Sequence, residues 1–266
     1  MGLRKAGGST VKLRSALEHV THPFAIRRRL PRPFDAARIY ASSEGGLRYL
    51  GPRMKRVDPA LLRLAGELIR QGDVVWDIGA NLGLFTFAAS VASGQGGYVL
   101  AVEPDIQLVA LLHRASAVNR GHASVEVVPA AVADSLGVSR FHIAARNRST
   151  NHLDGFGTSQ AGGIRATHLV PTMTMDWLAT QFPSPDVVKI DVEEAEGTVL
   201  AGAGDLLRTH PRIICEVAAR NSATVATILK DHGYTLYDGN QPAQKREALS
   251  LAPHNTLALP AQGLLR

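Results

Sequence analysis

The 266-residue sequence has almost no cysteine and no long apolar run. Cys215 is its only cysteine, which excludes an internal disulfide and any zinc site built from several cysteines. No stretch approaches the roughly 18 apolar residues of a membrane-spanning helix. The N-terminus also lacks the continuous apolar segment of a secretory signal. We therefore expect a protein that stays in the reducing environment of the cytoplasm.

Acidic residues are scarce at the start of the chain. Residues 1–56 contain 13 Lys or Arg against three Asp or Glu, a net charge of +10, which leaves −4 for the remainder because the total is +6. We divide the chain into a basic N-terminal extension, residues 1–57, and one α/β domain, residues 58–266. The extension is interpreted as a solvated tail or as a contact surface for an acidic partner, a phosphorylated substrate or a membrane. An Arg-rich organelle transit peptide is a further alternative.

Short apolar runs alternate with segments of helical periodicity after Asp58, which suits a helix N-cap before Pro59. This alternation predicts an α/β, Rossmann-like fold with a mostly parallel sheet, helices on both faces and an antiparallel closing pair. The expected strands are residues 74–78, 98–102, 125–128, 139–144, 187–190, 213–217, 234–237 and 256–259. The expected helices begin at Pro59 and then cover residues 84–92, 105–119, 176–180, 194–207 and 222–232.

Three segments fall outside this alternation. Residues 1–33 have no periodicity and are expected to be irregular. Residues 36–50 are expected to form a short hairpin that turns at Gly45 and Gly46. Residues 146–167 are polar and rich in glycine, and we expect a loop there that shapes a binding pocket.

The strand at residues 74–78 runs into a glycine turn that begins a helix. Asp77 lies near the end of the strand, and Gly79, Ala80, Asn81 and Gly83 follow in the turn. Gly79 allows close approach of the backbone to a ligand, and ligands in such sheets lie at the carboxyl ends of the strands. The spacing G-x-x-x-G differs from the G-x-G-x-x-G of dinucleotide enzymes and favours a ligand without phosphates. S-adenosylmethionine, with its cationic ammonium and sulfonium, fits this prediction, with the Asp77 carboxylate near its amino acid portion.

Glu103 ends the next expected strand and is followed by Pro104. A carboxylate at that position accepts hydrogen bonds from the two hydroxyls of a ribose and rejects a 2′-phosphate. The glycine turn and Glu103 together predict a site for a nucleoside-containing cofactor.

Three segments of the sequence together resemble the FkbM family of methyltransferases. The resemblance implies a class I methyltransferase fold over roughly residues 45–260, S-adenosylmethionine as cofactor, and methylation of hydroxyl groups on natural products or glycan sugars. The chain departs from the family at Glu194, where glycine is usual, so the turn or the charge of the pocket is expected to differ. The segments are VVWDIGANLGLFT at residues 74–86, Glu103-Pro104 and VKIDVEEAEGTVLAG at residues 188–202, with PRIICEV at residues 211–217 and Asn255-Thr256-Leu257 in further agreement.

Acidic residues crowd the end of the strand at residues 187–190. If the strand continues, Asp191 and Glu193 point to the same side, next to the cofactor. Methyl transfer to an alcohol benefits from a base that removes the hydroxyl proton. We expect Asp191 as that base with Glu193 beside it, and His152 and His254 are alternative bases. A second hypothesis places a divalent cation between Asp191 and Glu216, although we expect no metal.

The expected partner is a small molecule with a hydroxyl group. A nucleic acid is disfavoured because the acidic residues repel phosphate and no aromatic follows them to stack a flipped base. Cys215 lies in a strand and is not expected to be a nucleophile. A non-catalytic Rossmann-like binding module remains an alternative, and Glu194 is the departure that favours it. The sequence does not specify an oligomeric state.

Overall fold

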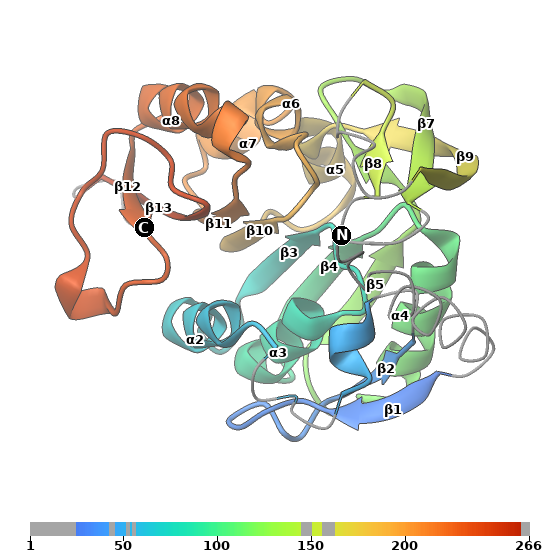
Figure 1. Ribbon diagram of the computed structural model, residues 1–266. Helices are drawn as coiled ribbons and strands as arrows, with labels where there is room; N and C mark the ends of the chain where they lie inside the picture. The colour runs from blue at the N-terminus through green and yellow to red at the C-terminus, as the bar shows by residue number, and fades with distance from the viewer. Residues whose placement is uncertain are drawn as a thin grey trace, which may run out of the picture.

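The computed structural model describes residues 25–42, 46–51, 54, 57–144, 151–155 and 163–261. Within these residues, seven strands form one sheet in the order β12-β13-β11-β10-β3-β4-β5 (Figure 1). The strands pair in parallel except β13, which is antiparallel to both β11 and β12. They are β3 (Val74–Ile78), β4 (Tyr98–Val102), β5 (Ser124–Val128), β10 (Val187–Ile190), β11 (Arg212–Glu216), β12 (Tyr234–Asp238) and β13 (Asn255–Pro260).

Helices cover both faces of this sheet because strand residues point alternately to either side. Val75 and Val99 pack with one apolar cluster, and Trp76 and Leu100 pack with the other. Figure 1 shows one group of helices on each face. The first group is α2 (Pro59–Leu68), α3 (Leu84–Ser93) and α4 (Ile106–Val118), and the second is α5 (Met175–Gln181), α6 (Glu196–Ala201), α7 (Gly204–Leu207) and α8 (Ser222–Asp231).

The predicted α/β fold, with a mostly parallel sheet and helices on both faces, is confirmed. The strands of the main sheet were predicted within two residues at each end, and the antiparallel pair lies where it was expected, with β13 between β11 and β12. Asp58 caps α2, since its side chain accepts a hydrogen bond from the backbone of Leu61 at 3.0 Å. No helix in the described part of the chain is long and apolar enough to cross a membrane.

The prediction of one helix over residues 194–207 was wrong, because α6 and α7 replace it. The helix is interrupted at Gly202. A Cβ added at this residue would lie only 2.4 Å from the carbonyl oxygen of Ala133. This close approach between two backbones leaves no room for a side chain. A helical pattern in the sequence does not reveal such a contact, because the contact is made with a distant segment.

The predicted hairpin at residues 36–50 was also wrong. Strand β2 (Arg38–Ala41) pairs with the preceding β1 (Ile26–Arg29), and Leu47–Tyr49 forms the short 3-10 helix η2. The expectation of irregular structure was therefore incorrect for residues 26–29, while residues 1–24 and Gly45 lie outside the described residues. The sequence of β1 gives no apolar signal for a strand, because three of its four residues are arginine and most are exposed.

The β1–β2 hairpin shares the core of the domain. Leu30 and Ile39 are buried in the same apolar cluster as α3 and α4. The Asn119 amide at the end of α4 accepts a hydrogen bond from the backbone N–H of Arg38 at 2.8 Å and donates one to its carbonyl at 2.6 Å. The division of the chain at residue 57 stays a prediction, but the β1–β2 part of the proposed extension packs into the core of the α/β domain.

A second sheet, in the order β6-β9-β7-β8, lies beside the ends of the main strands (Figure 1). Its members are β6 (Ala131–Val132), β7 (Gly137–Ala144), β8 (His152–Leu153) and β9 (Ile164–Met173). The extra strand expected at residues 139–144 is confirmed as part of β7. The prediction of a loop over residues 146–167 was wrong at β8 and at the start of β9, which are strands. Residues 145–150 and 156–162 lie outside the described residues. Strand β9 is largely exposed, so it has no clear apolar period.

Candidate functional site

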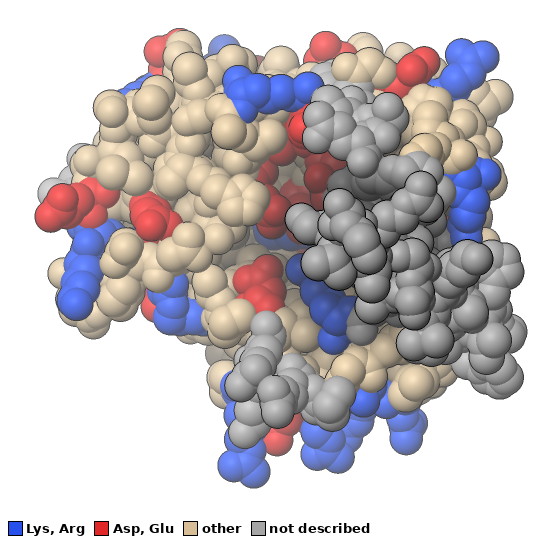
Figure 2. All heavy atoms as spheres, viewed as in Figure 1, with Lys and Arg blue, Asp and Glu red and all other residues tan. Residues whose placement is uncertain are grey.

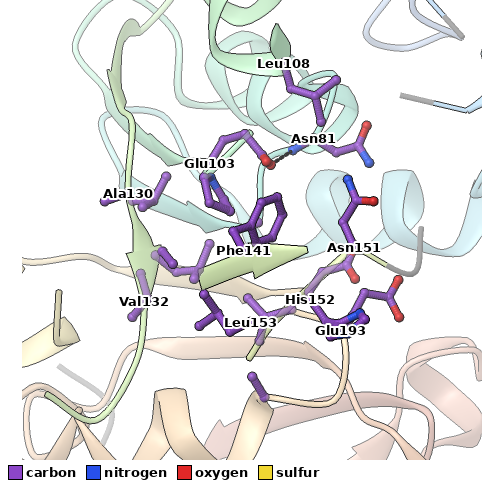
Figure 3. A pocket seen from close by; sticks show the side chains of 18 of the residues that line it. Asn81, Glu103, Leu108, Ala130, Val132, Phe141, Asn151, His152, Leu153 and Glu193 are labelled. Carbon is purple, nitrogen blue, oxygen red and sulfur yellow. Dashed lines mark hydrogen bonds between the residues drawn. The ribbon is translucent and has the colours of Figure 1, made fainter. Parts of the chain in front are cut away.

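A cavity of about 300 Å³ opens at the carboxyl ends of β3, β4, β10 and β11. This is where the strand order reverses, since β4 follows on one side of β3 and β10 lies on the other. Open α/β sheets bind ligands at such a switch point. The second sheet supplies another wall through Phe141, Asn151, His152 and Leu153 (Figure 3).

The glycine turn after β3 forms one side of the cavity. Gly79 has φ +78°, and a Cβ there would lie 2.0 Å from the carbonyl oxygen of Asp191. Gly83 begins α3 with φ +85°, and its Cβ would meet the ring of Phe87 at 2.6 Å. Both glycines are therefore required by contacts within the protein. The closeness of Gly79 to Asp191 joins the turn to the loop that follows β10.

Glu103 projects from the end of β4 into the same cavity and is only 5% exposed. One carboxylate oxygen accepts a hydrogen bond from the backbone N–H of Asn81 at 2.8 Å (Figure 3). The other accepts one from the backbone N–H of Asp105 at 2.9 Å. Burial raises the pKa of Glu103 to about 7. Each oxygen retains a further lone pair, so the carboxylate is held in place and can still accept hydrogen bonds from a ligand.

The predicted cofactor residues divide into two groups. Gly79, Asn81, Glu103 and Pro104 line the cavity. Asp77, Ala80 and Gly83 are not among the lining residues. Asp77 is fully buried, where it accepts a hydrogen bond from Thr86 Oγ1 at 2.6 Å and lies 3.0 Å from Lys189 Nζ. Its carboxylate therefore lies behind the turn, and its contact with the cofactor stays a prediction.

The predicted catalytic residues Asp191, Glu193 and His152 all line the cavity. The reason given for the first two was wrong, because β10 ends at Ile190 and they lie in the following loop. Glu216 at the end of β11 completes this acidic wall, and Figure 2 shows acidic side chains in the hollow on this face. Burial and the neighbouring carboxylates Asp191 and Glu216 raise the pKa of Glu193 to about 8.

The acids of this wall differ in their partners. Asp191 Oδ2 lies 3.3 Å from Lys189 Nζ. Glu216 Oε1 lies 3.4 Å from His254 Nε2, and His254 is not one of the residues lining the cavity. Glu193 forms no ion pair within the described residues. It is therefore the carboxylate whose negative charge is compensated least.

His152 enters the cavity wall from β8. The centroid of its ring lies 5.4 Å from that of His142. The His142 ring in turn contacts Thr167 Oγ1 through Nδ1 at 3.0 Å and Asp154 Oδ1 through Nε2 at 3.3 Å. Within the described residues, no group of three or more His, Cys, Asp or Glu side chains is arranged to hold a metal ion. The site offers carboxylates and an imidazole as possible proton acceptors.

Comparison with known proteins agrees with this geometry. The sequence model described as the methyltransferase FkbM domain matches residues 77–236. The chain belongs to the FkbM methyltransferase family. Over 70% of its length it is 33% identical to the 31-O-demethyl-FK506 methyltransferase FkbM of Streptomyces tacrolimicus, and it covers 81% of that protein. The family resemblance predicted from the sequence is confirmed.

Two solved structures are among those to which this chain is similar. Methyltransferase FkbM from Methylobacillus flagellatus KT is 13% identical, with a TM-score of 0.44 over 95% of this chain and 60% of that one. A precorrin-6y C5,15-methyltransferase from Geobacter metallireducens GS-15 is 16% identical, with a TM-score of 0.43 over 77% of this chain and 86% of that one.

Glu194, which stands where the FkbM family usually has glycine, adopts the backbone conformation of a glycine. Glu194 has φ +63°, a left-handed conformation that suits glycine. Its side chain pairs with Arg220 at 2.6 Å and is not among the residues lining the cavity. The substitution keeps a glycine-like backbone, so it gives no support to a non-catalytic module. The extra charge expected in the pocket is directed to Arg220.

Sequence reasoning missed several residues of the site. Arg48, Phe141 and Leu153 line the cavity, and Lys189 lies behind it. Phe141 and Leu153 belong to the second sheet, whose position beside the ends of the first is not encoded in a local pattern. Lys189 had a visible signal, because a lysine inside a run of buried strand residues requires partners.

Proposed function

We propose that this FkbM-family protein transfers a methyl group from S-adenosylmethionine to a hydroxyl group of a small molecule, either a natural product or a sugar. One observation carries the proposal: a single cavity has Glu103 at one wall and the acidic pair Asp191 and Glu193 at another. The printed name of the Streptomyces relative, a 31-O-demethyl-FK506 methyltransferase, supports oxygen as the acceptor atom.

The chemistry of the cavity fits the cofactor. Its walls carry carboxylates, which favour the cationic ammonium and sulfonium groups of S-adenosylmethionine. Glu103 would accept hydrogen bonds from the ribose hydroxyls, and the backbone from Gly79 to Asn81 would contact the cofactor beside it. When bound, the cofactor supplies a methyl group activated by a positively charged sulfur.

Glu193 is the favoured proton acceptor within this proposal. Asp191 is paired with the buried ammonium of Lys189, so the negative charge of its carboxylate is already compensated. Glu193 has no such partner in the described chain, and burial raises its pKa to about 8, so its ionised form binds a proton well. The hydroxyl proton passes to the Glu193 carboxylate as the oxygen becomes nucleophilic. His152 faces the same cavity and is the second candidate.

The acidic wall also bears on the class of acceptor. Carboxylates at Asp191, Glu193 and Glu216 repel a phosphate backbone, so a small neutral or cationic acceptor suits the cavity better than nucleic acid. The proposed location in the cytoplasm rests on the sequence composition alone.

Mass spectrometry with deuterated-methyl S-adenosylmethionine tests the proposal. The acceptors are 31-O-demethyl-FK506 and a panel of sugars and hydroxylated natural products, and we expect the labelled methyl on an oxygen. Glu193→Gln should lower turnover about 10²–10⁴-fold, the contribution typical of a general base.

Glu194→Gln is the matched control, because that side chain faces Arg220, and it should keep turnover within about twofold of wild type. Label on nitrogen, carbon or nucleic acid would contradict O-methylation. Full turnover by Glu193→Gln would move the role of base to His152.

A further inference from the structure

Lys189 is a charged side chain in the centre of the main sheet. It lies on β10 between two neighbouring parallel strands, and the residue is 5% exposed. A buried lysine is rare unless its charge is compensated. The role of this ammonium group therefore depends on the oxygens around it.

Three oxygens from three different segments surround the Lys189 ammonium. It donates a hydrogen bond to the carbonyl oxygen of Gly79 at 2.8 Å. It forms ion pairs with Asp77 Oδ1 at 3.0 Å and with Asp191 Oδ2 at 3.3 Å. An ammonium has three N–H donors, so its number of partners matches its capacity. The segments are the end of β3, the glycine turn and the loop after β10.

Two of these partners line the proposed site. Gly79 and Asp191 both line the cavity, whereas Asp77 lies behind it. The backbone N–H of Asp191 also donates to the carbonyl of Ile78 at 3.0 Å, so the turn and the loop touch directly. Without a cation between them, the carboxylates of Asp77 and Asp191 would repel each other.

We propose that Lys189 is a positioning residue that holds the cofactor turn and the acidic loop in one fixed arrangement. The inference rests on the proposed function and adds to it a residue that acts through Gly79 and Asp191. A lysine that served only to neutralise Asp77 in the core would need neither of these partners. The Lys189 ammonium also faces the Asp191 carboxylate, whereas Glu193 has no such partner in the described chain.

The single variant Lys189→Met leaves Asp77 buried and unpaired, which is expected to destabilise the fold strongly. The test therefore uses the double variant Asp77→Asn/Lys189→Met. The amide oxygen introduced by Asp77→Asn still accepts the hydrogen bond from Thr86, and Asp191 is partly exposed to water. Thermal unfolding should show a folded double variant close in stability to wild type.

Calorimetric titration with S-adenosylhomocysteine measures the positioning role. We expect the double variant to bind at least tenfold more weakly than Asp77→Asn alone, since only the double variant lacks the ammonium beside Gly79 and Asp191. Lys230→Met is the matched control, because that ammonium donates to the exposed carbonyl of Ser250, and it should bind like wild type.

Equal affinity of Asp77→Asn and the double variant for S-adenosylhomocysteine would overturn the inference and reduce Lys189 to a partner of Asp77. Absence of binding by the wild-type protein would contradict the proposed function itself, and the inference with it. The two failures are therefore distinguishable in one series of titrations.

Discussion

Single carboxylates around the cavity have different partners, and their chemistry differs accordingly. Glu103 is held by two backbone N–H groups, Asp191 by the Lys189 ammonium, and Glu193 by neither kind of partner in the described chain. A held carboxylate is suited to binding, whereas an uncompensated one is suited to accepting a proton.

The raised pKa of Glu193 predicts a stability that depends on pH. Its pKa rises from 4.5 in the unfolded chain to about 8 in the fold, so the folded protein disfavours the ionised form. The cost is absent below pH 4.5, grows as pH rises and is complete above pH 8. Glu193→Gln should therefore be more stable than wild type by about 1–3 kcal/mol at pH 9 and nearly equal at pH 4. Urea denaturation at both pH values measures this, and a pH-independent difference would contradict it.

The left-handed backbone of Glu194 predicts an order among substitutions. Glu194→Gly relieves the cost of a side chain at φ +63°, whereas Glu194→Ala keeps that cost. Both variants lose the partly exposed ion pair with Arg220, so that loss cancels in the comparison. The glycine variant should be more stable than the alanine variant by about 1 kcal/mol. Equal midpoints in urea would show that this turn carries no such strain.

Among the elements, the sequence predicts the buried strands best. Strands β3, β4 and β10 are short apolar runs whose burial on both faces leaves a clear signal. Strands β1 and β9 are mostly exposed, so their residues follow no apolar period and the prediction missed them. The break between α6 and α7 depends on a contact at Gly202 with a distant backbone, which local periodicity cannot encode.

The hairpin β1–β2 makes a testable contribution to the fold. Leu30 follows β1 and is 2% exposed in the core, whereas Ile26 at the start of the same strand is 48% exposed. Leu30→Ala should lower the free energy of unfolding by about 2–4 kcal/mol, the range for a buried leucine. Ile26→Ala is the matched control and should change it by less than about 0.5 kcal/mol. Similar effects of the two substitutions would mean that the hairpin does not pack on the domain.

At the scale of the whole molecule, the site contains residues that sequence motifs predict and residues that only tertiary packing brings together. The glycine turn and Glu103 were predicted from their spacing after buried strands, and both reach the cavity. The wall at Phe141 requires the second sheet to lie beside the ends of the first, and the contact of Lys189 with Asp77 requires β10 to lie beside β3. These relations appear only once the chain is folded.

Calorimetric titration of the wild-type protein and of Glu103→Ala with S-adenosylmethionine tests the central claim most directly. We predict saturable binding at one site by the wild type. The variant should lose about 1.5–3 kcal/mol of binding free energy, the scale of a lost hydrogen-bond partner that is charged, with its fold intact by circular dichroism. No binding by the wild type, or equal affinity for both proteins, would contradict a cofactor site at the carboxyl end of β4.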